Sequence, residues 1–242
     1  MTTNSTMILL SLFLASIILF YIFAFLIKWR DIMNSLLTPL ARKIPPYITP
    51  NLISVIYMVF VLIAGLFIYL AKYNYYFFLW AAVFVLIFGI SDSLDGILAR
   101  VRNQTSRSGA FLDYTLGKLG EIFLFFTLLL GGHVNAVLVV ITMLGAVFYS
   151  FLSMESQALT GNRFPKTGSP RWIVLPILVS ILLFFSKYLG VDTLILWGRQ
   201  FRSLDLVFLM MPIYYVVFTS YRAVVLYKEL KKLDQEEKIT QS

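Results

Sequence analysis

Three aspartates lie close together in the stretch DSLDGILARVRNQTSRSGAFLD, which runs from residue 92 to residue 113. Asp92 and Asp95 are three positions apart and therefore share one face of a helix. Asp113 follows a basic linker and opens the next apolar segment. Carboxylates brought together from two helix ends offer the oxygen ligands that hard divalent cations prefer. With several arginines nearby, the pattern favours chemistry on a metal-bound phosphate or pyrophosphate.

The simpler alternative is that each aspartate pairs with a neighbouring arginine in a solvated loop. This alternative is favoured for any single aspartate but not for the whole spacing. Gly96 directly follows Asp95, and Ala99 continues the small surface one turn further on. A surface without side chains lets a ligand or another helix approach closely.

The composition predicts what surrounds these acids. Of 242 residues, 60% are hydrophobic and only 13% are charged, with a mean hydropathy of +0.84. Soluble domains contain about 25% charged residues, and apolar stretches of about 20 residues are long enough to cross a bilayer as helices. We therefore expect an all-α, polytopic membrane helix bundle. There is no cysteine, which excludes disulfides and thiolate metal sites.

Seven apolar segments are candidate membrane spans. Residues 29–50 are expected to form an interfacial amphipathic helix that ends at Pro45-Pro46. The expected organisation is an extra N-terminal transmembrane helix in 1–28, the interfacial segment in 29–50, a membrane domain in 51–227 and a charged tail in 228–242. The candidate spans are 7–27, 52–71, 75–94, 114–131, 134–154, 172–189 and 205–225.

The net charge of +8 has an explanation that needs no nucleic-acid partner. With the N-terminus outside and seven spans, 16 of the 20 Lys and Arg residues fall on the cytoplasmic side. This is the bias expected of cytoplasmic loops. It places residues 92–117 on the cytoplasmic side, where one span ends and the next begins.

The acidic stretch also resembles a known family signature. The pattern Asp92-x2-Asp95-Gly96-x2-Ala99-Arg100-x8-Gly109-x3-Asp113 is similar, over 22 positions, to that of the CDP-alcohol phosphotransferases, also called CDP-alcohol phosphatidyltransferases. Thr49-Pro50-Asn51 resembles the start of the family's first core helix. The resemblance covers roughly residues 45–225 and implies a six-helix core, to which the first helix is an addition.

Members of that family cleave the pyrophosphate of a CDP-linked donor, join its phosphoryl group to an alcohol and release CMP. The resemblance therefore implies an enzyme of phospholipid biosynthesis that uses Mg²⁺ or Mn²⁺. Its partners would be a CDP-linked lipid donor, an alcohol or polyol-phosphate acceptor and the membrane lipid itself; family members commonly form homodimers. The implied metal ligands are Asp92, Asp95 and Asp113, and the implied nucleotide-binding residues are Gly96, Ala99, Arg100 and Gly109.

One position departs from the signature. The family has a fourth aspartate four residues after the third, thought to act as general base, and here Gly117 stands there, followed by Lys118. Glu121 lies on the same helix face, about 6 Å deeper, and is the candidate substitute base. The alternative is a structural role, with Glu121 paired to a polar group on a neighbouring helix. Loss of a general base typically costs a factor of about 10² to 10⁴.

The sequence is compatible with three explanations of Gly117: a transferase that uses Glu121 or another base, a slow or one-metal transferase, and a degenerate homologue that binds nucleotide or lipid without turnover. A divalent-cation transporter is disfavoured, because it would need acids spread through the membrane midplane rather than gathered at one end. If the source is prokaryotic, the expected location is the plasma membrane.

The loop GNRFPKTGSPRW at 161–172 holds a second group of cations, Arg163, Lys166 and Arg171. One interpretation is the ordinary positive charge of a cytoplasmic loop. The other is a subsite for the phosphate of a phosphorylated acceptor.

Overall fold

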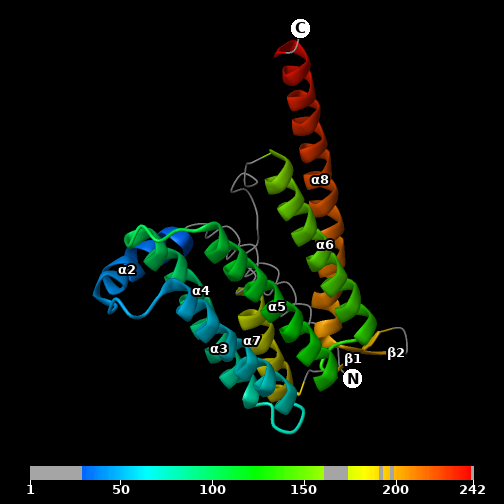
Figure 1. Cartoon of the computed structure of the whole chain (residues 1–242). Coiled ribbons are helices and arrows are strands. Elements are labelled where there is room, and N and C mark those ends of the chain that lie inside the picture. Colours follow the sequence, from blue (N-terminus) through cyan, green and yellow to red (C-terminus); the bar gives the residue numbers. More distant parts are fainter. Residues whose placement is uncertain (1–28, 161–173, 191–192, 197–198, 241–242) are drawn as a thin grey trace. The chain divides into compact units, whose positions relative to one another are not determined.

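The computed structural model describes residues 29–160, 174–190, 193–196 and 199–240, so the predicted span 7–27 and the loop 161–172 lie outside the described residues. Helices α2–α5 and α7 and a short hairpin belong to one compact unit, while α6 and nearly all of α8 belong to a second. The elements are α2 (Trp29–Lys43), α3 (Pro50–Leu70), α4 (Phe77–Val101), α5 (Arg107–Gly131), α6 (Ala136–Thr160), α7 (Val174–Tyr188), β1 (Thr193–Leu196), β2 (Arg199–Arg202) and α8 (Ser203–Thr240) (Figure 1).

The predicted all-α membrane bundle is confirmed. In the described part of the chain, α3, α4, α5 and α6 are each long and apolar enough to cross a bilayer. The one departure is the antiparallel hairpin β1–β2, which the sequence did not predict. Two four-residue strands are marginal on their own. Here Arg202 donates to the backbone carbonyls of Gly132 and Val134, which holds the hairpin against the turn after α5.

Helix α3 begins where the sequence places the start of the first core helix. Thr49 is the N-cap, and its hydroxyl accepts a hydrogen bond from the Leu52 amide at 3.1 Å. Pro50 occupies the first helical position, where its missing N–H costs nothing. The first turn of α3 is thereby fixed at the end of the bundle that carries the aspartates.

The predicted helix limits around the aspartates are wrong in one respect. The expected spans end at residue 94 and resume at 114, but α4 continues to Val101 and α5 begins at Arg107. Hydropathy marks the apolar part of a helix, whereas the hydrogen-bonded backbone continues until a cap or a turn stops it. For α5 the cap is Ser106, whose hydroxyl accepts from the Gly109 amide at 3.0 Å. The aspartates therefore lie within rigid helices, joined by a linker of only five residues, 102–106.

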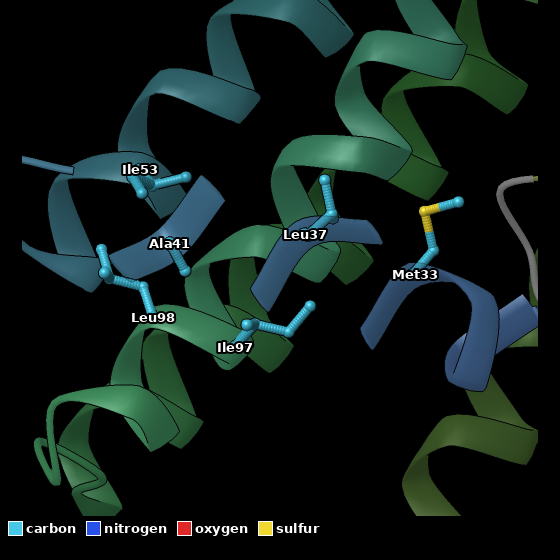
Figure 2. Packing of buried hydrophobic residues seen from close by; sticks show 6 residues of the cluster. All are labelled: Met33, Leu37, Ala41, Ile53, Ile97 and Leu98. Atoms are coloured by element: carbon cyan, nitrogen blue, oxygen red, sulfur yellow. The ribbon is translucent and has the colours of Figure 1, made fainter. Parts of the chain in front are cut away.

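Helix α2 packs one apolar face on the bundle and ends before Pro45-Pro46, as predicted. Leu36 and Leu40 on the same helix are exposed. The placement of α2 at a membrane interface stays a prediction. The buried cluster between α2, α3 and α4 consists of Met33, Leu37, Ala41, Ile53, Ile97 and Leu98 (Figure 2).

Arg102 fixes the segment between α2 and α3 to the end of α4. Its guanidinium donates to the carbonyls of Ile48 at 2.7 Å, Ile44 at 2.6 Å and Pro45 at 3.0 Å. One of the arginines near the aspartates thus binds the backbone. The Pro45 carbonyl also accepts from the Ile48 amide at 3.1 Å, so this short segment is held both by its own turn and by Arg102.

Helices α3 and α5 approach each other through two glycines. A Cβ atom at Gly65 would lie 2.3 Å from the ring of Phe123, and one at Gly120 would lie 3.2 Å from Val61. A side chain at Gly65 would displace the ring of Phe123, and one at Gly120 would require Val61 to shift by a few tenths of an ångström. The close approach carries the first turns of α3 to the aspartate on α5.

His133 links the far ends of α3 and α5. Its Nε2 lies 2.9 Å from the Ile68 carbonyl, and its ring packs edge-on against Phe78 with centroids 4.8 Å apart. Burial lowers the pKa of His133 to about 4, although the hydrogen bond to Ile68 acts in the opposite direction. The neutral ring therefore donates Nε2–H to the carbonyl at neutral pH.

Acidification is expected to destabilise the folded protein through this histidine. The unfolded side chain binds a proton near pH 6.5 but the folded one only near pH 4, so the free energy of unfolding falls as the pH drops through this window. The loss is about 2 kcal/mol at pH 5. Thermal unfolding of the purified protein in detergent at pH 7 and pH 5 measures it. His133→Gln should show a smaller fall in Tm, and an equal fall in both proteins would contradict the assignment.

Candidate active site

The three aspartates of the signature come together at one end of α3, α4 and α5. Asp92 and Asp95 lie on α4 and Asp113 on α5. The carboxyl groups of Asp92 and Asp113 are within hydrogen-bonding reach of each other, and Asp95 is close enough to act on both electrostatically. The structure therefore assembles the acids that the sequence singled out.

Helix α3 contributes two hydroxyl groups that contact these acids. Ser54 donates to Oδ2 of Asp95 at 2.5 Å, in a bond that joins positions 41 residues apart. Tyr57 donates to the backbone carbonyl of Asp113 at 3.0 Å, and its hydroxyl lies 3.5 Å from the Oδ1 atom of that residue. Both residues were missed in the sequence. Their spacing of three on an otherwise apolar helix was the available signal.

Asp95 is buried, with 3% of its surface exposed, and one of its oxygens is left over. Oδ1 has no hydrogen-bond partner, although Oδ2 is held by Ser54. A buried acceptor without a partner costs about 1–3 kcal/mol, and more when it is charged. Three acids at close range also repel one another when ionised. Both costs fall when a cation binds between them.

The donor set fits a hard divalent cation, which prefers carboxylate oxygens. Within the described residues, no three side chains of His, Cys, Asp or Glu are already gathered tightly enough to hold an ion. Asp92 and Asp113 face each other, whereas Asp95 is directed at Ser54. The predicted ligand role of the three aspartates therefore stays a prediction.

Three of the predicted nucleotide-binding residues, Gly96, Ala99 and Arg100, lie on α4 after Asp95. A Cβ atom at Gly96 would sit 3.4 Å from the guanidinium of Arg100, which is ordinary contact. Arg100 is exposed and donates to Oδ1 of Asn34 on α2 at 3.3 Å. The small surface that continues through Ala99 is therefore bordered by a cation that reaches toward α2.

Gly109 lies where the first turns of α3 and α5 meet. A Cβ atom there would be 3.0 Å from the cap hydroxyl of Ser106 and 3.3 Å from Oδ1 of Asn51. A side chain at this position would require these two side chains to shift by a few tenths of an ångström. A role in nucleotide binding stays a prediction.

Gly117 leaves open space where the family signature has an acid. A Cβ atom at this position would meet nothing within 4 Å. One turn deeper, Oε2 of Glu121 accepts from Nζ of Lys118 at 2.7 Å, while Oε1 is buried without a hydrogen-bond partner. The partner of Glu121 thus lies on its own helix rather than on a neighbouring one. Both the structural and the catalytic interpretation of Glu121 remain.

The predicted acceptor-phosphate residues Arg163, Lys166 and Arg171 lie outside the described residues. Their position relative to the aspartates therefore stays a prediction from the sequence.

Comparison with known proteins decides the family. The sequence model of CDP-alcohol phosphatidyltransferase matches residues 47–211, about two thirds of the chain. The chain belongs to this family. The matched region contains α3, α4 and α5 and all three aspartates. The protein is thus a multi-pass membrane protein of a transferase family in phospholipid biosynthesis.

Curated relatives share part of the chain. An archaetidylinositol phosphate synthase of Pyrococcus horikoshii is 31% identical over 110 residues, which is 46% of this chain and 56% of the relative. A phosphatidylinositol phosphate synthase of Streptomyces avermitilis is 35% identical over 96 residues, or 38% of this chain and 37% of the relative. The chain thus matches little more than half the length of the first relative and less of the second.

Solved structures show the same fold. Phosphatidylinositol phosphate synthase of Mycobacterium tuberculosis with CDP-DAG bound gives a TM-score of 0.61 at 20% identity, covering 78% of this chain and 92% of that one. The same enzyme in complex with manganese and citrate gives a TM-score of 0.60, covering 78% of this chain and 88% of that one. The manganese complex supports the use of a divalent metal in CDP-alcohol phosphatidyltransferases.

Proposed function

We propose that this CDP-alcohol phosphatidyltransferase moves a phosphatidyl-type group from a CDP-linked lipid to an alcohol, with release of CMP, in phospholipid biosynthesis. The convergence of Asp92, Asp95 and Asp113 from two helices is the observation that carries the proposal. These acids stand at the signature spacing, and α3 supports them from a third side. Two of the relatives are synthases of inositol-phosphate lipids, which favours a polyol phosphate as the acceptor.

In this proposal the three aspartates hold Mg²⁺ or Mn²⁺, which supplies positive charge to the donor pyrophosphate when bound. Gly96, Ala99 and Gly109 leave room for the nucleotide, and the guanidinium of Arg100 lies at its edge. A phosphorylated acceptor would bind through its phosphate at Arg163, Lys166 and Arg171, because guanidinium and ammonium groups are strong phosphate donors.

Glu121 is the proposed substitute base. Its carboxylate accepts the proton of the acceptor hydroxyl, whose oxygen then forms a bond to the lipid-bearing phosphorus. The bond from this phosphorus to the oxygen of CMP breaks, and CMP leaves with the electron pair. Lys118 donates to Oε2 of Glu121, and the second oxygen, Oε1, has no hydrogen-bond partner.

The alternative is a degenerate homologue that binds CDP-lipid without turnover. Gly117 favours it, because the position of the family's fourth aspartate carries no side chain. In either case the site is proposed to open to the cytoplasm, with the N-terminus outside, in the plasma membrane of a prokaryotic source. A homodimer is proposed on family resemblance alone.

Release of CMP by the purified protein tests the proposed function. The assay combines Mg²⁺ or Mn²⁺, CDP-diacylglycerol or CDP-archaeol, and a panel of acceptors that includes inositol phosphate, glycerol phosphate and the unphosphorylated alcohols. We expect CMP to form with one acceptor and to disappear when the metal is chelated. Metal-dependent binding of CDP-lipid without CMP from any pair would establish the degenerate homologue instead.

A further inference from the structure

Ser54 and Tyr57 stand one helical turn apart on α3 and direct their hydroxyls at different helices. Ser54 contacts Asp95 on α4, and Tyr57 contacts Asp113 on α5. Neither residue belongs to the signature that identifies the family. Their side chains are almost fully buried, with exposed fractions of 3% for Ser54 and 0% for Tyr57. These contacts are therefore part of the interior of the site rather than of its solvated rim.

The Ser54 hydroxyl has one proton and two acceptors within reach. The carboxylate oxygen Oδ2 of Asp95 is at 2.5 Å, whereas the Pro50 carbonyl is at 3.3 Å. A bond to a carboxylate is shorter and stronger than one to a neutral carbonyl. The Ser54 hydroxyl therefore donates its proton to Oδ2 of Asp95, and this hydrogen bond sets the orientation of the carboxyl group.

In this orientation the two carboxylate oxygens of Asp95 have different environments. Oδ2 is occupied by Ser54, and Oδ1 is buried without a partner. Serine and alanine differ by one oxygen atom, so Ser54 is not needed to fill space at this position. Its hydroxyl instead fixes which carboxylate oxygen remains available.

We propose that Ser54 is a positioning residue for cation binding, holding Oδ2 of Asp95 so that Oδ1 is presented to a divalent metal. This inference rests on the metal role of Asp95 in the proposed function. Tyr57 acts in the same way on α5, where its hydroxyl holds the backbone of Asp113 and lies beside the side chain. Partners that orient metal ligands typically change metal affinity by about 10- to 100-fold when they are removed.

Mn²⁺ binding to the full-length protein in detergent tests the proposal without any substrate. The binding is measured as the loss of the electron paramagnetic resonance signal of free Mn²⁺. Ser54→Ala is expected to raise the Kd for Mn²⁺ by about 10- to 100-fold. Ser54→Thr, which keeps the hydroxyl, should bind close to the wild-type value. Tyr57→Phe retains the ring that packs on Phe88 and should also bind Mn²⁺ more weakly.

Thr127→Val is the matched control on the same bundle. Its hydroxyl is buried and donates to the Leu124 carbonyl on its own helix, so its removal should leave Mn²⁺ binding unchanged. In the CMP assay, excess Mn²⁺ should restore much of the rate of Ser54→Ala, because a higher metal concentration compensates for a weaker metal affinity. A rate lost through a structural defect would not respond to added metal.

Asp95→Asn separates failure of this inference from failure of the proposed function. If Asp95→Asn loses Mn²⁺ binding while Ser54→Ala binds like the wild type, the positioning role of Ser54 is wrong and the metal role of Asp95 stands. If the wild type itself does not bind Mn²⁺, the metal role fails and the inference about Ser54 falls with it.

Discussion

Asp113→Asn is expected to reduce the rate of CMP release at least about 10³-fold. A bound metal contributes several kcal/mol of charge stabilisation to phosphoryl transfer, and each 1.36 kcal/mol corresponds to a factor of ten in rate. Asparagine has nearly the shape of aspartate but carries no charge, so the packing around Tyr57 should survive. The measurement is the initial rate of CMP formation at saturating donor and acceptor, with wild type and variant at equal amounts of folded protein.

Asp234→Asn is the matched control, because it is the same chemical change at an exposed residue near the end of α8. It should leave the rate unchanged. An Asp113→Asn protein with the wild-type rate would remove Asp113 from the catalytic machinery.

A stability measurement separates charge from packing in the same variant. A ligand that binds only the folded state stabilises it, by about 2.7 kcal/mol at a concentration one hundred times its Kd. Wild-type Tm should therefore rise with added Mn²⁺, and that of Asp113→Asn should rise much less. Without metal the variant should be no less stable than the wild type, because the substitution removes the negative charge of Asp113, which repels the carboxylate of Asp92.

The general architecture and the acidic signature could be predicted from the sequence because both depend on local patterns. Long apolar segments are read directly as membrane helices. The start of α3 at Thr49 and Pro50 and the end of α2 before Pro45-Pro46 follow from residues that favour or forbid particular backbone conformations. The contacts of Asp95 and Asp113 with α3 are different. They depend on how far three helices rotate and how closely they approach, which Gly65 and Gly120 control from two turns or more away.

Two further findings lie beyond local patterns for related reasons. Arg102 looks like its neighbour Arg100 in the sequence, yet one side chain satisfies three backbone carbonyls and the other reaches across to Asn34. Only the path of the 44–48 segment distinguishes them. The helices that carry the aspartates also extend past the apolar stretches, because composition sets the edge of a membrane span and capping sets the end of a helix.

Glu121→Gln is the second variant with a large expected effect. If Glu121 takes the proton of the acceptor hydroxyl, the amide should lower kcat by about 10² to 10⁴ and leave Mn²⁺ binding intact. Glutamine can still accept a hydrogen bond from Lys118, so the fold of α5 should be retained. The measurement is kcat and KM for donor and acceptor, together with the Mn²⁺ affinity of the same preparation.

Gly117→Asp in the Glu121→Gln background is expected to restore activity. A side chain at position 117 enters open space one turn from Asp113, on the face that the family signature uses for its fourth acid. Gly117→Asn in the same background fits the same space but cannot take a proton, so it should not restore activity.

A different result would change the assignment of the base. If Glu121→Gln keeps the wild-type rate while Gly117→Asp alone raises it, the pair of Glu121 with Lys118 is structural and the chain is a transferase slowed by the loss of its fourth aspartate.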